Sequence, residues 1–70
     1  MITVVVEGPD HSGKGYVIAA ITHALQELGC NVVVQGAETH NASKLAKTDD
    51  EIKQRLDGQQ IRIMEMQTNF

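Results

Sequence analysis

The residues best suited to chemistry gather in one stretch, GPDHSGKG, which covers residues 8–15. The spacing of Gly8, Gly13 and Lys14 matches the phosphate-loop pattern G-x-x-x-x-G-K-[ST], except that Gly15 stands where the pattern has a hydroxyl residue. Glycines in such a loop let the backbone curl so that successive N–H groups point inward. These donors, the N-terminus of the following helix and the lysine together attract phosphate oxygens. The pattern therefore predicts a phosphate site.

The candidate phosphate- and nucleotide-binding residues lie in this loop and in the first helical turn after it. They are Gly8, Asp10, His11, Ser12, Gly13, Lys14, Gly15 and Tyr16. Asp10 could accept a hydrogen bond from a ribose hydroxyl or cap the helix. His11 could donate to a phosphate or stack on a base, or it could be an ordinary exposed loop residue. Tyr16 could stack on a base or ribose, or it could be packing.

A second group of possible ligand contacts follows the second apolar run of the chain. These residues are Glu38, Thr39 and His40. In open α/β sheets, ligands bind beyond the carboxyl ends of the strands, and both this segment and the glycine-rich loop would emerge at that edge. An ordinary surface loop explains the same residues equally well.

Two β-branched runs flank the predicted helix. ITVVV at residues 2–6 and CNVVV at residues 30–34 are typical of strands buried on both faces of a parallel sheet. Between them, Gly29 stands where a left-handed C-cap belongs. The apolar stripe of the intervening helix is formed by Val17, Ile18, Ile21, Ala24, Leu25 and Leu28. A strand, loop, helix and second strand form a βαβ unit with a right-handed crossover, so we expect an α/β fold with parallel strands.

The second half of the chain is expected to complete one small domain of residues 1–70. Residues 37–47 read as a loop that could hold one helical turn. Thr48 and Glu51 fit a capping box, which predicts a C-terminal helix over residues 48–67 that Gly58 interrupts. A short strand within IRIMEM is the alternative, because Ile61 and Ile63 alternate with Arg62.

The segment 1–36 also resembles the N-terminal segment of thymidylate kinases and related phosphate-loop nucleotide kinases. The residues that carry the resemblance are Glu7, Gly8, Asp10, Ser12, Gly13 and Lys14, followed by LQELGCNVVV. The resemblance implies that the ligand is a nucleotide and that the chain is a truncated phosphate-loop unit. In the family an Arg-Glu-Pro segment follows the second strand. QGAETH stands there in this chain, so that role is not carried over.

The departures from this family predict a binder that performs no catalysis. The family's hydroxyl after the lysine ligates Mg²⁺, and Gly15 has no side chain that could do so. No apolar run ends in a second metal-holding Asp, and the two arginines, Arg55 and Arg62, read as helix-surface charges. We therefore expect no catalytic residue, no metal site, no required cofactor and no Mg²⁺.

Composition restricts the other partners. A net charge of −3 disfavours a nucleic-acid backbone, and no apolar run is long enough to cross a bilayer. No secretory signal is visible, and a single cysteine, Cys30, excludes an internal disulfide. Cys30 is expected to be buried, in a soluble cytoplasmic protein. Because 70 residues form a small core, we also expect a homo-oligomer.

These observations favour a protein that holds a nucleotide or nucleotide-derived small molecule, and that could sequester a signal as a viral immune-evasion protein would. An alternative is a protein-interaction or inhibitor module on a relic phosphate-loop scaffold. Its contact face would comprise Ile52, Leu56, Ile63, Met64 and Met66. A second alternative is a nucleotide kinase or hydrolase that needs a partner subunit to supply the missing ligands.

Overall fold

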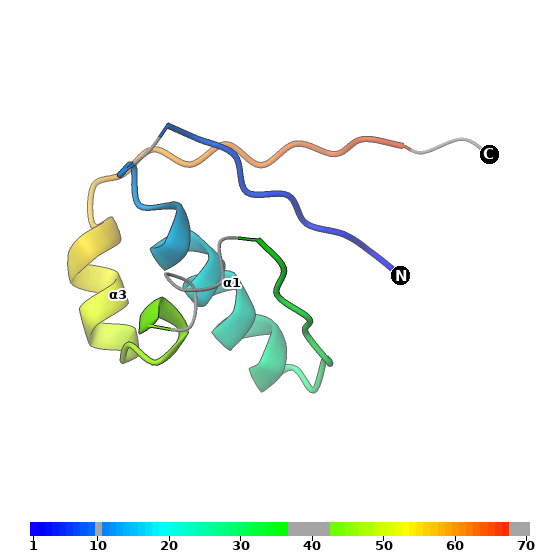
Figure 1. The fold of residues 1–70 in the computed structure, drawn as a ribbon, viewed down its shortest axis with the longest axis horizontal. Helices are drawn as coiled ribbons and strands as arrows, with labels where there is room; N and C mark the ends of the chain where they lie inside the picture. The colour runs from blue at the N-terminus through cyan, green and yellow to red at the C-terminus, as the bar shows by residue number, and fades with distance from the viewer. Residues whose placement is uncertain (10, 37–42, 68–70) are drawn as a thin grey trace.

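The computed structural model describes residues 1–9, 11–36 and 43–67. Within them, helix α1 (Lys14–Glu27) packs against helix α3 (Asp49–Leu56), as Figure 1 shows. Residues 43–45 form one helical turn ahead of α3, where one turn was predicted inside the loop. No strand or sheet occurs in the described residues, so the predicted α/β class with its parallel βαβ unit is wrong.

Helix α1 begins and ends at glycines with positive φ. Gly13 is its N-cap at φ 100°, and Gly29 lies just beyond its C-cap at φ 91°. At the C-terminal end, the N–H of Gly29 donates to the carbonyl of Gln26 at 2.9 Å. The N–H of Cys30 donates to the carbonyl of Leu25 at 3.0 Å. These two bonds form a Schellman motif, and the predicted left-handed C-cap at Gly29 is confirmed.

Helix α3 starts at the predicted capping box. The N–H of Glu51 donates to Thr48 Oγ1 at 3.2 Å, and the N–H of Thr48 donates to Glu51 Oε1 at 3.3 Å. The helix ends at Leu56, and Gly58 at φ 77° turns the chain away. The predicted helix over residues 48–67 is therefore wrong beyond Leu56. Residues 59–67 are extended and belong to no strand.

The buried core lies between the two helices and is small. Among the described residues with side chains, Ala19 and Thr22 of α1 and Ile52 of α3 are the buried ones. Ala19 and Thr22 are three positions apart, so they share one helix face. The predicted stripe of α1 is covered only in part, since Leu28 is 78% exposed. The large side chain of Ile52 on α3 therefore packs against a face of α1 that carries the smaller side chains of Ala19 and Thr22.

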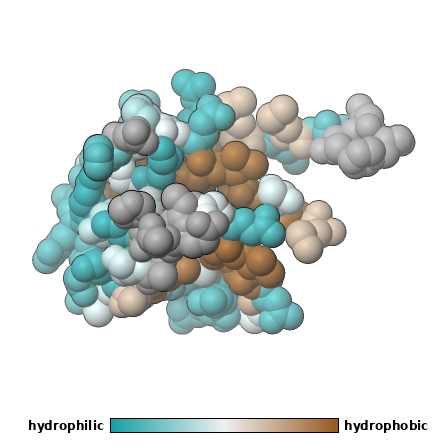
Figure 2. Space-filling view, viewed as in Figure 1, coloured by the Kyte–Doolittle hydropathy of each residue, from teal (hydrophilic) through white to brown (hydrophobic). Residues whose placement is uncertain are grey.

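Three extended segments, residues 1–9, 30–36 and 59–67, leave apolar side chains in solvent. Within the described parts of the chain, no backbone hydrogen bond joins one of these segments to another. Their exposed large hydrophobic residues are Met1, Ile2, Val4, Val5, Val33, Ile61, Ile63, Met64 and Met66. Figure 2 shows hydrophobic surface where residues 1–9 and 30–36 run in Figure 1. Cys30 is also exposed, contrary to the sequence-based expectation.

The failed strand prediction has a simple physical cause. A β-branched run prefers an extended backbone, but a strand also needs a neighbour that accepts its N–H groups and donates to its carbonyls. Residues 2–6 and 30–34 adopt the extended backbone without such a neighbour. These runs therefore have the extended backbone that their residues prefer, but among the described residues they have no hydrogen-bonded neighbouring strand.

Candidate functional site

The glycine-rich loop turns tightly into the first turn of α1. The N–H of Ser12 donates to the carbonyl of Pro9 at 3.3 Å, and His11 has a left-handed backbone with φ 60°. The carbonyl of Gly13 accepts from the N–H groups of Tyr16 and Val17, both at 3.1 Å. The loop therefore ends at the N-terminus of a helix, where backbone donors and the helix dipole favour an anion.

Lys14 folds back over the loop that precedes it. Its Nζ donates to the carbonyl of Gly8 at 2.6 Å and to the carbonyl of Pro9 at 3.3 Å. These bonds hold the ammonium charge across the loop instead of letting it point into solvent. The position suits a lysine that meets phosphate oxygens, because a bound phosphate would face both the ammonium group and the helix N-terminus.

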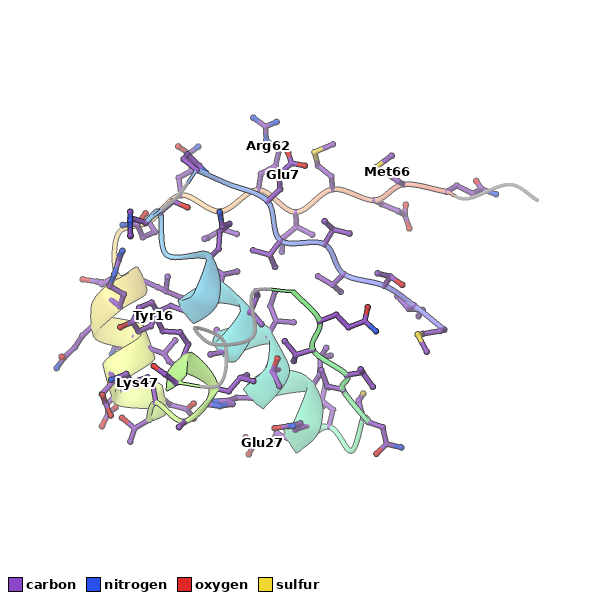
Figure 3. The ribbon with its side chains drawn as sticks, in the orientation of Figure 1. Glu7, Tyr16, Glu27, Lys47, Arg62 and Met66 are labelled. Atoms are coloured by element: carbon purple, nitrogen blue, oxygen red, sulfur yellow. The ribbon has the colours of Figure 1, made fainter. Side chains whose placement is uncertain are left out.

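Two further cations lie on the ring of Tyr16. Lys44 Nζ is 4.3 Å from the ring centroid, and Arg55 Cζ is 5.4 Å from it. Figure 3 shows Tyr16 on the side of α1 that faces α3. Such cation–π contacts contribute about 0.5–1 kcal/mol each at exposed sites. Tyr16 therefore gathers positive charge beside the loop, and its role in stacking on a base or ribose stays a prediction.

Arg55 reaches the loop from α3. Its guanidinium nitrogens are 3.5 Å and 3.6 Å from the position that a Cβ on Gly13 would take. Arg55 lies on a helix, as predicted, and the packing of α3 on α1 also brings its guanidinium to the N-terminal turn of α1. No motif links positions 13 and 55, so sequence reasoning had no signal for this residue.

Gly15, the departure from the phosphate-loop pattern, leaves room for Lys44. A Cβ at position 15 would lie 2.8 Å from Lys44 Cγ, which is closer than real Cβ contacts allow. A serine or threonine there would push Lys44 off the Tyr16 ring. Position 15 therefore lacks the hydroxyl of the phosphate-loop pattern, and the ammonium-bearing side chain of Lys44 lies against it instead.

The side chains around the N-terminus of α1 are positively charged, whereas the chain as a whole is negative. The chain carries a net charge of −3, yet Lys14, Lys44 and Arg55 converge at the N-terminus of α1. Among the described residues, no carboxylate lies within 4.0 Å of the Lys44 or Arg55 charge. We name Lys14, Lys44 and Arg55 the cation cluster.

His23 connects α1 to both elements that carry the outer cations. Its Nδ1 is 3.0 Å from Asp49 Oδ1, and its Nε2 is 2.8 Å from the carbonyl oxygen of Leu45. The hydrogen bond to Asp49, and then the one to Leu45, raises the pKa of His23 above its ordinary value. Sequence analysis did not select His23. Its side chain is 26% exposed and hydrogen-bonded at both ring nitrogens.

An open groove of about 420 Å³ runs between α1 and α3 beside His23. Its lining is formed by Ala20, His23, Ala24, Glu27, Asp49, Ile52, Lys53 and Leu56. None of the described residues of the glycine-rich loop lines this groove. We therefore take the cation cluster, and not this groove, as the candidate site.

The remaining predicted contacts stay untested. Asp10, Glu38, Thr39 and His40 lie outside the described residues. Within residues 1–9, 11–36 and 43–67, no three His, Cys, Asp or Glu side chains are arranged to hold a metal ion. No helix in this part of the chain has the length and hydropathy needed to cross a membrane.

Comparison with protein-family models, with curated proteins and with solved structures gives no match to this chain. The arguments for its function therefore come from its own residues.

Proposed function

We propose that this chain binds the phosphate groups of a nucleotide or a nucleotide-derived small molecule and does not transfer them. The observation that carries the proposal is the convergence of the cation cluster on the N-terminus of α1. Lys14 is the first residue of α1, Lys44 comes from the turn at residues 43–45 and Arg55 from α3. Together they surround one helix N-terminus with positive charge.

Phosphate fits this arrangement because it can use several donors at once. Its oxygens accept charge-assisted hydrogen bonds from ammonium and guanidinium groups, each worth about 1.5–3 kcal/mol. The N–H of Gly15, in the first turn of α1, has no acceptor among the described residues. The resemblance to thymidylate kinase-like segments is what favours a nucleotide over free phosphate as the ligand.

We propose that the protein binds its nucleotide without converting it, and that it thereby sequesters a nucleotide signal. Phosphoryl transfer relies on a metal-binding hydroxyl at the position of Gly15, and the space there is taken by Lys44. Positive charge without that hydroxyl stabilises the bound anion but supplies no metal ligand. We therefore expect tight binding without turnover, and no requirement for Mg²⁺.

A specific observation favours a second candidate, the protein-interaction module. Ile63, Met64 and Met66 of its proposed contact face are 93%, 66% and 83% exposed. Figure 3 shows Met66 pointing away from the helices. Of that face, Ile52 is instead buried against α1. In that module the exposed part would contact another protein. In the homo-oligomer expected from the small core, a second copy of the chain would cover it instead.

The experiment is native mass spectrometry of the purified protein, followed by calorimetric titration with a panel of nucleotides. We expect a bound nucleotide, or binding from the panel, that is weakened about tenfold or more in Lys14→Ala. Arg62→Ala is the matched control, because Arg62 lies on the exposed C-terminal segment. Equal affinity in Lys14→Ala and the wild type would overturn the proposal. An empty oligomer that ignores the whole panel would favour the interaction module.

A further inference from the structure

Both ring nitrogens of His23 face hydrogen-bond acceptors. Nδ1 faces a carboxylate oxygen of Asp49, and Nε2 faces the carbonyl oxygen of Leu45. A neutral imidazole carries one N–H and can satisfy one of these acceptors, whereas an imidazolium donates to both. Both acceptors around His23 therefore receive a hydrogen bond only when the ring is protonated.

The two acceptors belong to the elements that carry the outer cations. Leu45 follows Lys44 in the helical turn at residues 43–45. Asp49 is the first residue of α3, the helix that carries Arg55. Lys44 and Arg55 in turn lie on the Tyr16 ring beside the loop. One side chain of α1 therefore ties down both elements that complete the cation cluster.

We propose that His23 is a positioning residue whose protonated ring holds Lys44 and Arg55 at the phosphate loop, so that ligand affinity falls when His23 loses its proton. This regulation rests on the proposed function. The positioning of the two cations does not, because it concerns contacts within the protein alone.

The charges that face His23 come from both helices and from the turn. On α1, Glu27 lies one turn after His23 and lines the same groove. On α3, Asp49 and Lys53 line that groove, and in the turn Lys44 directly precedes Leu45. The carboxylates of Glu27 and Asp49 favour the imidazolium, and the two lysines oppose it. Asp49 dominates because it is in direct contact at 3.0 Å.

The sign of the effect follows from the direction of the shift. Because the hydrogen bonds to Asp49 and Leu45 raise the pKa of His23, its contribution is complete below the ordinary imidazole pKa. That contribution is lost as the pH rises through the raised pKa. The cations should therefore be held on the acidic side of this transition and released on the basic side.

Tyr16 offers a readout that needs no ligand. The chain has one tyrosine and no tryptophan, so intrinsic fluorescence reports the ring on which Lys44 and Arg55 lie. Fluorescence of the full chain is recorded from about pH 5.5 to about pH 8.5, the range in which histidines titrate. The ring pKa of His23 is measured in parallel by nitrogen-15 NMR. His23→Gln removes the titration and keeps one donor, while Glu65→Gln, on the exposed C-terminal segment, is the control.

We expect one fluorescence step in the wild type at the NMR pKa of His23, retained in Glu65→Gln and absent in His23→Gln. Asp49→Asn, which keeps an acceptor but removes the charge, should move the midpoint to lower pH. Circular dichroism checks that each variant keeps its helices. If His23→Gln unfolds, the Asp49→Asn midpoint decides. A flat wild-type trace while NMR shows His23 titrating, or an unmoved midpoint in Asp49→Asn, overturns the inference.

The second arm measures ATP affinity over the same pH range in the wild type and in His23→Gln. The ratio of the two affinities cancels the titration of ATP itself. We expect the ratio to fall about threefold or more as the pH rises, since two cations leave the site. A constant ratio overturns the regulation. No ATP binding at any pH, together with a normal Tyr16 step, overturns the proposed use of ATP-like ligands and leaves the positioning by His23 established.

Discussion

The guanidinium of Arg55 lies against Gly13, with a nitrogen 3.5 Å from the position that a Cβ on this glycine would occupy. Gly13 is the N-cap of α1 and Arg55 lies near the end of α3, so the contact brings a cation from one helix to the N-terminus of the other. A side chain at position 13 would also meet the positive φ of 100°. The lack of a side chain at Gly13 thus allows both the left-handed turn and the close approach of Arg55.

Arg55→Ala should weaken nucleotide binding about tenfold, because a charge-assisted contact to phosphate is lost. The two helices should remain, since Ile52 and not Arg55 fills the core between them. Calorimetric titration measures the affinity, and circular dichroism measures the helix content. Arg62→Ala is the control. An Arg55→Ala variant that binds as the wild type does would remove this residue from the site.

Gly15→Ser restores the hydroxyl of the phosphate-loop pattern, and we expect it to weaken binding without creating turnover. The new Cβ would lie 2.8 Å from Lys44 Cγ and would push Lys44 off the Tyr16 ring. Tyr16 fluorescence should change, and phosphate release in the presence of Mg²⁺ should stay at the background rate. Mg²⁺-dependent turnover in this variant would instead favour the partner-dependent enzyme considered as an alternative.

Thr48→Ala should destabilise the protein by about 1 kcal/mol, because the two hydrogen bonds of the Thr48 hydroxyl to Glu51 disappear. Urea denaturation followed by circular dichroism measures the change. Thr68→Ala, in a segment outside the described residues, is a composition-matched control. An unchanged denaturation midpoint in Thr48→Ala would mean that this cap does not limit the stability of α3.

Acid should remove the contribution of the same cap. Hydrogen bonds from the backbone and side chain of Thr48, with the Lys47 charge as a smaller cause, lower the pKa of Glu51. The stabilisation is therefore present above the ordinary Glu pKa and is lost as the pH falls through the lowered value. Denaturation curves at several acidic pH values should show this loss in the wild type and less of it in Glu51→Gln. Identical acid dependence in both proteins would contradict the assignment.

The exposed C-terminal segment should mediate self-association. Ile63 is 93% exposed, so Ile63→Lys should leave the helix pair intact and reduce the mass of the oligomer. Light scattering coupled to size exclusion measures that mass. Leu28→Lys is a matched control, since Leu28 is also exposed but lies at the end of α1. Equal masses for Ile63→Lys and the wild type would exclude this segment from the interface.

Local features of the fold could be predicted from sequence because their partners are near neighbours. The capping box joins residues 48 and 51, and the C-cap at Gly29 closes bonds to residues within five positions. Such bonds depend on residue type and spacing, and both are visible in the sequence. The turn of the glycine-rich loop into α1 at Gly13 and Lys14 belongs to the same class.

The tertiary structure decided what depends on distant partners. The runs at residues 2–6 and 30–34 have strand-like composition, but pairing requires backbone groups from elsewhere, and in the described residues none provides them. Likewise, Arg55 reaches Gly13, and His23 bonds to Asp49, only because α3 packs on α1. Sequence alone determined the loop and the helix caps, since short-range hydrogen bonds specify them. The packing of α3 on α1 determined the cation cluster, because it brings together charges that are far apart along the chain.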